Sequence, residues 1–295
     1  MEGPVTVACA QVEPVPFERE RTIEKLAGVT AEAAGQGASL VVFPEAFIPV
    51  YPSSRWVRFL AAGGDAKPVY ARLARESVEI PGPAAERLAA VAREHGIWLA
   101  TGANELERGT VYNALLLFAP DGRLALHHRK LVPTNHERLV WGQGSGDGLQ
   151  AIETELGRVG GLICWENLMP LARFALYESG VEVYLAPTAD DSEPWHDSIR
   201  HIAREARAFV VSPCVFQRAS GYPDDVPLGD GPDLVGRGGS AIVAPDGSYL
   251  AGPLWDKEGI LYAELDPGVL YAERQRFDPA GHYHRPDVFR LKIRR

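Results

Sequence analysis

The sequence predicts an α/β protein in which helices cover β-sheets. Short apolar runs rich in β-branched residues alternate with stretches of helical apolar spacing along most of the 295 residues. Hydrophobic residues make up 46% and charged residues 23% of the chain, which is ordinary for a soluble globular protein. No low-complexity linker interrupts the alternation, so residues 1–295 are expected to form a single domain.

The N-terminal third contains three predicted strands and two predicted helices. A strand is expected over 5–12, and a helix over 18–35 that ends at glycines. A second strand, 39–47, should stop at Pro44, because proline has no N–H to donate to a central ladder. The list is completed by a helix over 84–94 opened by Pro83 and a strand over 97–104.

Two hairpins with the same turn follow. Apolar runs flank the turn "PDG" within 113–130, and a similar passage spans 239–252. Both contain "APDG", at 119–122 and 244–247. We interpret them as one hairpin duplicated in two related halves of a single domain. A chance repeat of a common turn tetrapeptide is the alternative.

The C-terminal half continues the alternation of strands and helices. A Pro/Gly/Asp-rich stretch, 221–233, is expected to be a loop or flap. The predicted regular elements are strands over 159–165, 181–187, 209–216 and 259–266, and helices over 168–179 and 195–208.

Charge and cysteine usage exclude several classes of function. The formal net charge is -9 and no basic stripe is present, so nucleic acid is not an expected partner. Cys9, Cys164 and Cys214 cannot all pair within one chain, and none lies in a metal-like spacing. No signal peptide and no apolar run of about 18 residues is present. We therefore expect a cytoplasmic protein with free thiols, no membrane partner and neither metal nor cofactor.

Three passages place chemically useful side chains at the polar ends of predicted strands. In "VVFPEAFIPVYP", Glu45 follows a buried strand among aromatic residues, where partial desolvation should raise its pKa toward that of a general base. Lys130 ends a hairpin strand, and an ammonium there can stabilise a developing negative charge. Cys164 ends "VGGLIC" and becomes a useful nucleophile beside a base. Taken singly, they also fit a loop glutamate, a surface lysine and a core thiol.

Together these passages resemble the nitrilase superfamily of carbon–nitrogen hydrolases. The order Glu45, Lys130, Cys164 matches its Glu-Lys-Cys triad, in "FPEAFIPVYP", "RKLVPTNHERLVWGQG" and "GGLICWENLMPLAR". The "CWEN" form is typical of the true nitrilase branch. The resemblance covers about residues 5 to 290 and implies an αββα sandwich, with two mixed β-sheets packed face to face and helices outside.

The resemblance also implies a reaction. Glu45 would take the thiol proton of Cys164, and the thiolate would attack a nitrile to give a thioimidate and then a thioester, releasing ammonia and a carboxylic acid. Lys130 would stabilise charge, and Glu137 falls on a second, supporting glutamate. The candidate substrate-binding residues are Tyr51, Trp165, His136 and Trp195, with Trp56 as a further aromatic. Core packing is an equally good interpretation of Trp56 and Trp195.

Several alternatives stay open on the sequence. An amidase of the same superfamily, or a nitrile hydrolase that releases much amide, shares the first chemical steps. A non-catalytic binding protein on the same fold is a different class. A serine hydrolase is disfavoured because no G-x-S-x-G motif occurs. Only "KIRR" follows Leu291, so we expect a homodimer or a modest homo-oligomer rather than long spirals.

Overall fold

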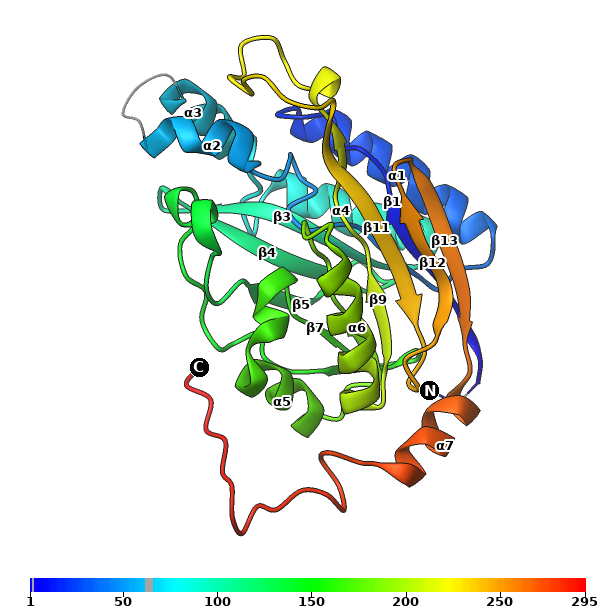
Figure 1. Ribbon diagram of the computed structural model, residues 1–295. Helices are drawn as coiled ribbons and strands as arrows, with labels where there is room; N and C mark the ends of the chain where they lie inside the picture. Colours follow the sequence, from blue (N-terminus) through cyan, green and yellow to red (C-terminus); the bar gives the residue numbers. More distant parts are fainter. Residues whose placement is uncertain (2, 62–65) are drawn as a thin grey trace.

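Two mixed β-sheets pack face to face at the centre of the protein, and helices cover their outer faces (Figure 1). A computed structural model describes residues 1, 3–61 and 66–295. Helices α1 (Arg19–Gly35) and α4 (Pro83–His95) lie on one sheet. Helices α5 (Pro170–Glu178) and α6 (Glu193–Ala206) lie on the other. The predicted αββα sandwich is confirmed.

The first sheet has the strand order β13-β1-β2-β3-β4-β5. Strands β1, β2 and β3 run parallel, and the β4–β5 hairpin and β13 add antiparallel edges. The bounds are β1 Val5–Gln11, β2 Leu40–Val42, β3 Trp98–Glu107, β4 Thr110–Phe118, β5 Leu124–Arg129 and β13 Gly259–Leu265. The strand predicted over 39–47 therefore ends even before Pro44, and Phe43 to Phe47 form a turn.

The second sheet repeats this plan. Its order is β10-β11-β9-β8-β7-β6, and β12 pairs with β11. Strands β7, β8 and β9 run parallel, and the β11–β12 hairpin extends them as β4–β5 extends β1–β3. This equivalence is what the duplication interpretation requires. The bounds are β6 Ile152–Thr154, β7 Gly157–Gly161, β8 Val183–Leu185, β9 Phe209–Ser212, β10 Phe216–Arg218, β11 Leu234–Val243 and β12 Tyr249–Trp255.

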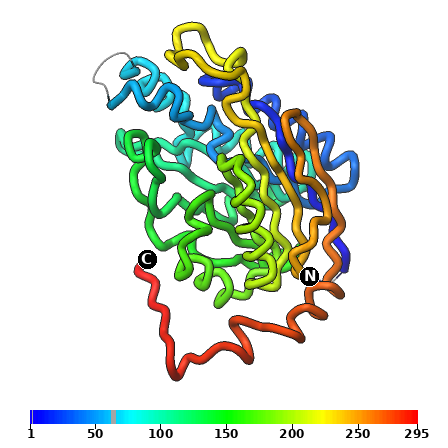
Figure 2. Tube along the Cα trace, viewed as in Figure 1, coloured from blue at the N-terminus to red at the C-terminus, as the bar shows by residue number. Residues whose placement is uncertain are grey.

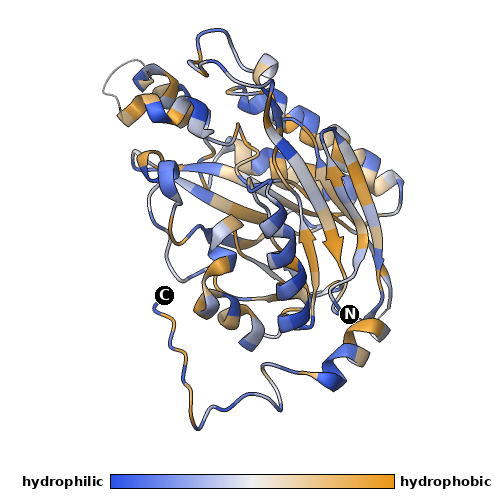
Figure 3. Ribbon diagram, in the orientation of Figure 1, coloured by the Kyte–Doolittle hydropathy of each residue, from blue (hydrophilic) through white to orange (hydrophobic). Residues whose placement is uncertain are grey.

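Alternating side chains on the strands build three apolar layers. In β1, Val7 and Cys9 point between the sheets, whereas Ala8 and Ala10 meet α1 and α4. On the far side, Ile199 and Ile202 of α6 pack on the second sheet, and the outer side of α6 is hydrophilic (Figure 3). Burial of these layers, at roughly 25 cal/mol per Å² of apolar surface, holds the strand ends in place.

The structure differs from the sequence-based expectation in a few elements. The strand predicted over 209–216 is two strands, β9 and β10, because Pro213 between them lacks an N–H. Three helices were not predicted: α2 (Ser54–Ala61), α3 (Lys67–Glu76) and α7 (Pro267–Arg276). Each is at most ten residues long and has at most two buried residues, so each offers only a short apolar pattern.

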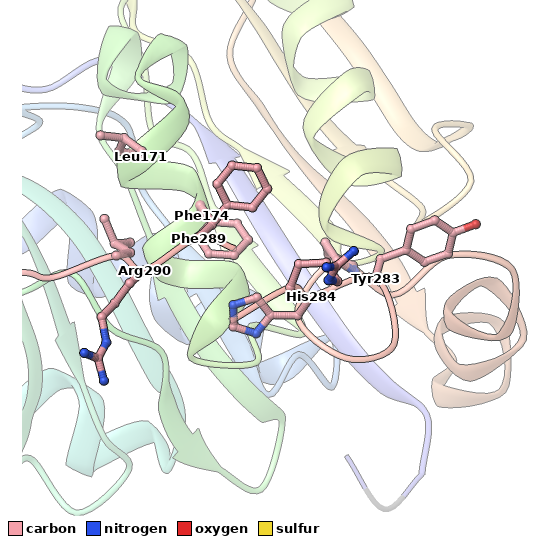
Figure 4. Close-up of a pocket in the computed structure, with 9 residues that line it drawn as sticks. Leu171, Phe174, Tyr283, His284, Phe289 and Arg290 are labelled. Carbon is pink, nitrogen blue, oxygen red and sulfur yellow. The ribbon is translucent and has the colours of Figure 1, made fainter. Parts of the chain in front are cut away.

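Two irregular segments lie at opposite ends of the molecule (Figure 2). Residues 221–233 have no strand, and Arg55 of α2 fixes them by donating to Pro232 O (2.7 Å) and Gly229 O (2.8 Å). The segment after α7 runs past α5, where a cavity of about 410 Å³ opens between Phe174 and the C-terminal residues (Figure 4). Within the described residues, no helix is both long and apolar enough to span a bilayer.

Candidate active site

Glu45 sits in the turn that follows β2 and is fully buried. The turn lies flat against β3: Gly102 N–H donates to Pro44 O (3.1 Å), and Ile48 N–H donates to Gly102 O (3.2 Å). A Cβ at Gly102 would overlap Pro44 O and Ala46 N, so only glycine permits this approach. The strand end and this contact aim the carboxylate of Glu45 into the protein.

Lys130 directly follows β5 and carries a buried ammonium group. Its Nζ is 2.7 Å from Glu45 Oε1 and 2.8 Å from Glu137 Oε2. Its backbone N–H donates to Asn113 O (2.7 Å), so hairpin register fixes its position. Burial alone would lower the pKa of Lys130, but the two carboxylates outweigh burial and raise it, which keeps the ammonium charged.

The carboxylate of Glu45 is held at one oxygen and free at the other. Oε1 accepts from Lys130 Nζ and from Asn113 Nδ2 (2.8 Å). Among the described residues, Oε2 has no hydrogen-bond partner. Burial and the nearby charge of Glu137 raise the pKa of Glu45 to about 7, although Lys130 opposes them. A free oxygen with this pKa suits a general base at neutral pH.

Glu137 lies on the short 3₁₀ helix η1 (Asn135–Leu139) and anchors Lys130 from the other side. Tyr51 Oη donates to Glu137 Oε1 (2.8 Å), and Thr134 N–H donates to Oε2 (2.6 Å). The carboxylate therefore has one partner from each of three segments. These partners fix the Glu137 carboxylate, which in turn holds the Lys130 side chain in one rotamer.

Cys164 begins the 3₁₀ helix η2 (Cys164–Leu168) just after β7, with φ of 51°. A positive φ is strained for a residue with a Cβ, so neighbouring contacts must hold it. Cys164 N–H donates to Pro187 O (2.9 Å), and the buried Asn167 Nδ2 donates to Cys164 O (2.8 Å). The turn presents the sulfur at the end of the strand, as the sequence predicted.

The sulfur of Cys164 lies within the field of the charged groups. Burial raises the pKa of the thiol, and Glu45 and Glu137 add to this, while Lys130 opposes it. The resting group is therefore a neutral thiol. It needs a base at the moment of attack, and Glu45 is the carboxylate whose charge acts on it most strongly.

A buried carboxylate, Glu166, ties the lysine passage to the cysteine passage. Its Oε1 accepts from Leu131 N–H (2.6 Å), next to Lys130, and its Oε2 accepts from Ile163 N–H (2.7 Å), next to Cys164. His128 Nε2 lies 3.0 Å from Oε2. Burial would raise the pKa of Glu166, but these partners outweigh it and hold the pKa below its usual range.

A cavity of about 200 Å³ opens over the thiol. Tyr51, His136 and Trp165 line it with Cys164 and Glu137, so three of the four predicted substrate-binding residues reach the cavity. The larger cavity beside α5 contains none of these groups. Over the described residues, no three His, Cys, Asp or Glu side chains are grouped to hold a metal ion.

Trp195 does not line this cavity, which corrects the expectation that it is a pocket residue. It is 2% exposed on the inner face of α6, and its indole N–H donates to Ser212 Oγ (3.0 Å). Trp56 is likewise fully buried, against Phe17. Both indoles complete apolar layers, where a large ring buries more surface than at a cavity wall.

The rim of the cavity combines an exposed indole with two carboxylates. Trp165 is 43% exposed, and its Nε1 donates to Asp190 Oδ2 (2.7 Å). Asp191 lies beside it, and its Oδ2 accepts from Arg237 N–H (3.1 Å). Burial lowers the pKa of His136, which keeps this imidazole neutral at neutral pH. Among the described residues that line the cavity, Asp190 and Asp191 give the rim negative charge and none carries a positive charge.

Sequence reasoning missed Asn113, Glu166 and Thr188, although all three touch the predicted site residues or their backbone. Asn113 interrupts an otherwise apolar strand and Thr188 follows the end of one, which was the available signal. Glu166 lies two residues after the candidate nucleophile in the cysteine passage, and the sequence did not indicate its buried contacts. Thr188 Oγ1 lies 3.2 Å from Cys164 Sγ.

Comparisons with known proteins identify the family of the chain. The sequence pattern of the carbon–nitrogen hydrolase family matches residues 6–275. The chain is 43% identical to an aliphatic nitrilase of Sinorhizobium fredii (strain HH103), over 97% of this chain and 94% of that protein. It is 42% identical to nitrilase 1 of Arabidopsis thaliana, over 98% of this chain and 86% of the relative.

Two further matches bear on activity and fold. A bifunctional nitrilase/nitrile hydratase of Lupinus angustifolius is 39% identical, over 98% of this chain and 86% of that protein. The crystal structure of Saccharomyces cerevisiae Nit3, from branch 10 of the nitrilase superfamily, superposes with a TM-score of 0.75. It is 21% identical, over 96% of this chain and 97% of that one, and so it shows the fold alone.

Replacing Glu166 with Gln should cost both stability and the alignment of Lys130 with Cys164. The amide has one acceptor oxygen, so one buried backbone N–H loses its partner, at about 1–3 kcal/mol. We expect the free energy of unfolding, from denaturant titration, to fall by that amount. The turnover rate should fall by about tenfold, because both segments shift.

Glu182→Gln is the matched control, since Glu182 also accepts a backbone N–H, from Arg158 (3.0 Å), but lies away from the cavity. Its amide oxygen can still accept that single N–H, so it should lose less stability, through the weakened ion pairs with the N-terminus and Arg274, and keep its turnover rate. Equal turnover in the two variants would show that Glu166 does not align the site.

Proposed function

The chain belongs to the carbon–nitrogen hydrolase family, within its nitrilase branch, and from this premise we propose that it hydrolyses an organic nitrile to the carboxylic acid and ammonia. One observation carries the proposal: a charged Lys130 is held between Glu45 and Glu137, its charge acts on the Cys164 thiol, and that thiol lines a cavity together with Glu137. These are the groups needed to add sulfur to a polar carbon–nitrogen multiple bond.

In the first step, Glu45 Oε2 accepts the proton of the Cys164 thiol as sulfur attacks the nitrile carbon. A sulfur–carbon bond forms and one carbon–nitrogen π bond breaks. The proton passes from Glu45 to nitrogen, which gives a neutral thioimidate. Lys130, together with the backbone N–H of Trp165, stabilises the negative charge that develops on nitrogen.

In the later steps, Glu45 activates water for two additions. The first water adds to the thioimidate carbon, the carbon–nitrogen bond breaks, and ammonia leaves a thioester. The second water adds to the thioester and releases the acid, and the sulfur recovers its proton. The balance is one nitrile and two waters to one acid and one ammonia. Glu137 keeps Lys130 in place throughout.

Release of some amide is a second outcome that one comparison favours. The Lupinus angustifolius relative is named a bifunctional nitrilase/nitrile hydratase. If the tetrahedral adduct of the first water loses sulfur rather than nitrogen, the product is the amide. Assaying acid, amide and ammonia from one nitrile, with the matching amide as a separate substrate, distinguishes nitrilase, hydratase and amidase activity.

We also propose that the site takes neutral or cationic nitriles in preference to anionic ones. Asp190 and Asp191 flank the cavity that Tyr51, His136 and Trp165 wall with aromatic surface. The charge of Lys130 is already balanced by two carboxylates. A substrate carboxylate at the rim would meet like charges, as would the acid product, which favours its release.

The cellular compartment of the protein is proposed from its cysteine thiols. Cys9, Cys164 and Cys214 are free and buried. A catalytic thiol persists best in a reducing compartment, so we propose that the protein is cytoplasmic. A homodimer or a larger homo-oligomer is proposed for its assembly, and light scattering after size-exclusion chromatography measures it directly.

Cys164→Ala should abolish release of ammonia from aliphatic, aryl and arylacetonitriles while leaving the circular dichroism spectrum unchanged. The thiol is needed for the first covalent step, whereas alanine fits the same strained turn at little cost. Cys214→Ala, which removes another buried thiol, should keep activity within about threefold. Retained turnover in Cys164→Ala would refute the mechanism.

Activity should rise with pH through the pKa of Glu45, which burial raises to about 7. The base must be ionised, so log(kcat/KM) should climb with a slope of one below that pH and level off above it. Asn113 donates to the ionised carboxylate and lowers this pKa. Asn113→Ala should therefore move the rising limb to higher pH, and a limb that does not move would exclude Glu45 as the titrating base.

The charge preference is tested with nitriles of equal size. 4-Aminobutanenitrile should have a higher kcat/KM than pentanenitrile, and 3-cyanopropanoate a lower one than 4-methylpentanenitrile, each by about three- to tenfold. Both ratios should shrink in about 0.5 M salt, which screens the rim charges.

Asp191→Asn removes one rim charge but keeps an acceptor for Arg237 N–H. It should therefore bring kcat/KM for each charged nitrile closer to that for its neutral partner. Glu24→Gln, on the exposed side of α1, changes net charge equally and should leave both kcat/KM ratios unchanged. If both kcat/KM ratios are the same in the parent protein and in Asp191→Asn, the rim carboxylates do not determine the charge preference.

A further inference from the structure

We propose that the side-chain hydroxyl of Thr188 donates a hydrogen bond to the sulfur of Cys164 and stabilises the thiolate as it forms. The inference rests on the proposed role of Cys164 as the nucleophile, and it adds a catalytic group from a different part of the chain. Thr188 follows β8, at the next strand end along the second sheet from Cys164.

The backbone around Thr188 leaves its side chain little freedom. Thr188 N–H donates to Pro213 O (3.0 Å), and Thr188 O accepts from Val215 N–H (2.9 Å), so the residue is bridged to the segment after β9. Thr188 is fully buried, and its Oγ1 is 3.2 Å from Cys164 Sγ. A hydroxyl held at this distance forms an O–H···S hydrogen bond without further movement.

The other partner of the hydroxyl favours donation to the sulfur. Asp190 N–H donates to Thr188 Oγ1 (2.9 Å) and so occupies a lone pair of the oxygen. Among the described residues, Cys164 Sγ is the recorded acceptor for the hydroxyl proton. Donation by Asp190 also polarises the O–H bond, which strengthens its own donation to sulfur.

The groups around the sulfur show why such a donor matters. Burial, Glu45 and Glu137 all disfavour the thiolate, and Lys130 opposes them. Lys130 is bound to two carboxylates at the same time. Among the described residues, Thr188 Oγ1 has no recorded hydrogen bond to either carboxylate, and its hydrogen bond to sulfur lowers the pKa of the thiol. It therefore supports the anion at sulfur, while Lys130 remains available for the nitrogen of the substrate.

The test compares variants that differ only in the hydroxyl. Thr188→Val keeps the branched shape and removes the O–H, and Thr188→Ser keeps the O–H. Alkylation of Cys164 by iodoacetamide is followed by peptide mass spectrometry from about pH 6 to about pH 10, with Cys9 and Cys214 as internal references. Kinetic constants for one nitrile are measured on the same preparations.

In Thr188→Val, the alkylation rate near pH 7 should fall about tenfold or more, and the rise of that rate with pH should move about one unit to higher pH. kcat should fall in parallel. KM should change little, because Thr188 lies outside the cavity lining. Thr188→Ser should stay within about threefold of the parent protein in all three measurements.

If Thr188→Val does not fold, Thr188→Ala and Thr188→Ser make the same comparison without a bulky side chain. Wild-type alkylation profiles in both Val and Ala variants would overturn the inference. A fall in kcat without a change in the alkylation profile would do so too, because it would indicate a structural role. A parent protein in which Cys164 reacts no faster than Cys9 would overturn the nucleophile assignment, and so the proposed function itself.

Discussion

A buried ammonium ion between two carboxylates is the interaction on which the site depends. Lys130 bonds to Glu45 and Glu137 where all three side chains are withdrawn from water. Removing one member of such a group leaves an uncompensated buried charge, at about 3–5 kcal/mol. The group therefore persists only while the turn after β2, the end of β5 and helix η1 are all in place. An intact site thus requires correct packing of the first sheet.

Each of the three site passages contains one residue with strained backbone. Ala46, Asn135 and Cys164 all have positive φ, and each lies in one of the three site passages. Such conformations cost about 1–3 kcal/mol apiece and survive when other contacts determine them. Here Gly102 leaves room for the turn that contains Ala46, and Asn167 holds the turn at Cys164. Stability from the apolar layers thus offsets the cost of presenting side chains at strand ends.

Much of the fold and of the candidate site could be predicted from the sequence, because the site residues lie at strand ends. Helix 18–35 and the two "APDG" hairpins follow from local patterns, and Glu45, Lys130 and Cys164 were found as polar groups that end apolar runs. Contacts set by register were not predictable: Asn113 reaches Glu45 only because β4 pairs with β3 as it does. Trp195 was misplaced because an indole suits a cavity wall and a core equally, and only the position of Ser212 decides.

The raised pKa values of Cys164 and Glu45 have the same effect, because both limit the negative charge near Lys130. A buried thiolate beside a buried carboxylate would place two negative charges near one ammonium. When Glu45 takes the proton as sulfur attacks, one negative charge leaves the carboxylate as another appears on the substrate. The total charge of the cavity floor does not change, so attack requires little new solvation. Lys130 loses one partner at the same moment, and its charge becomes available to the nitrogen that needs it.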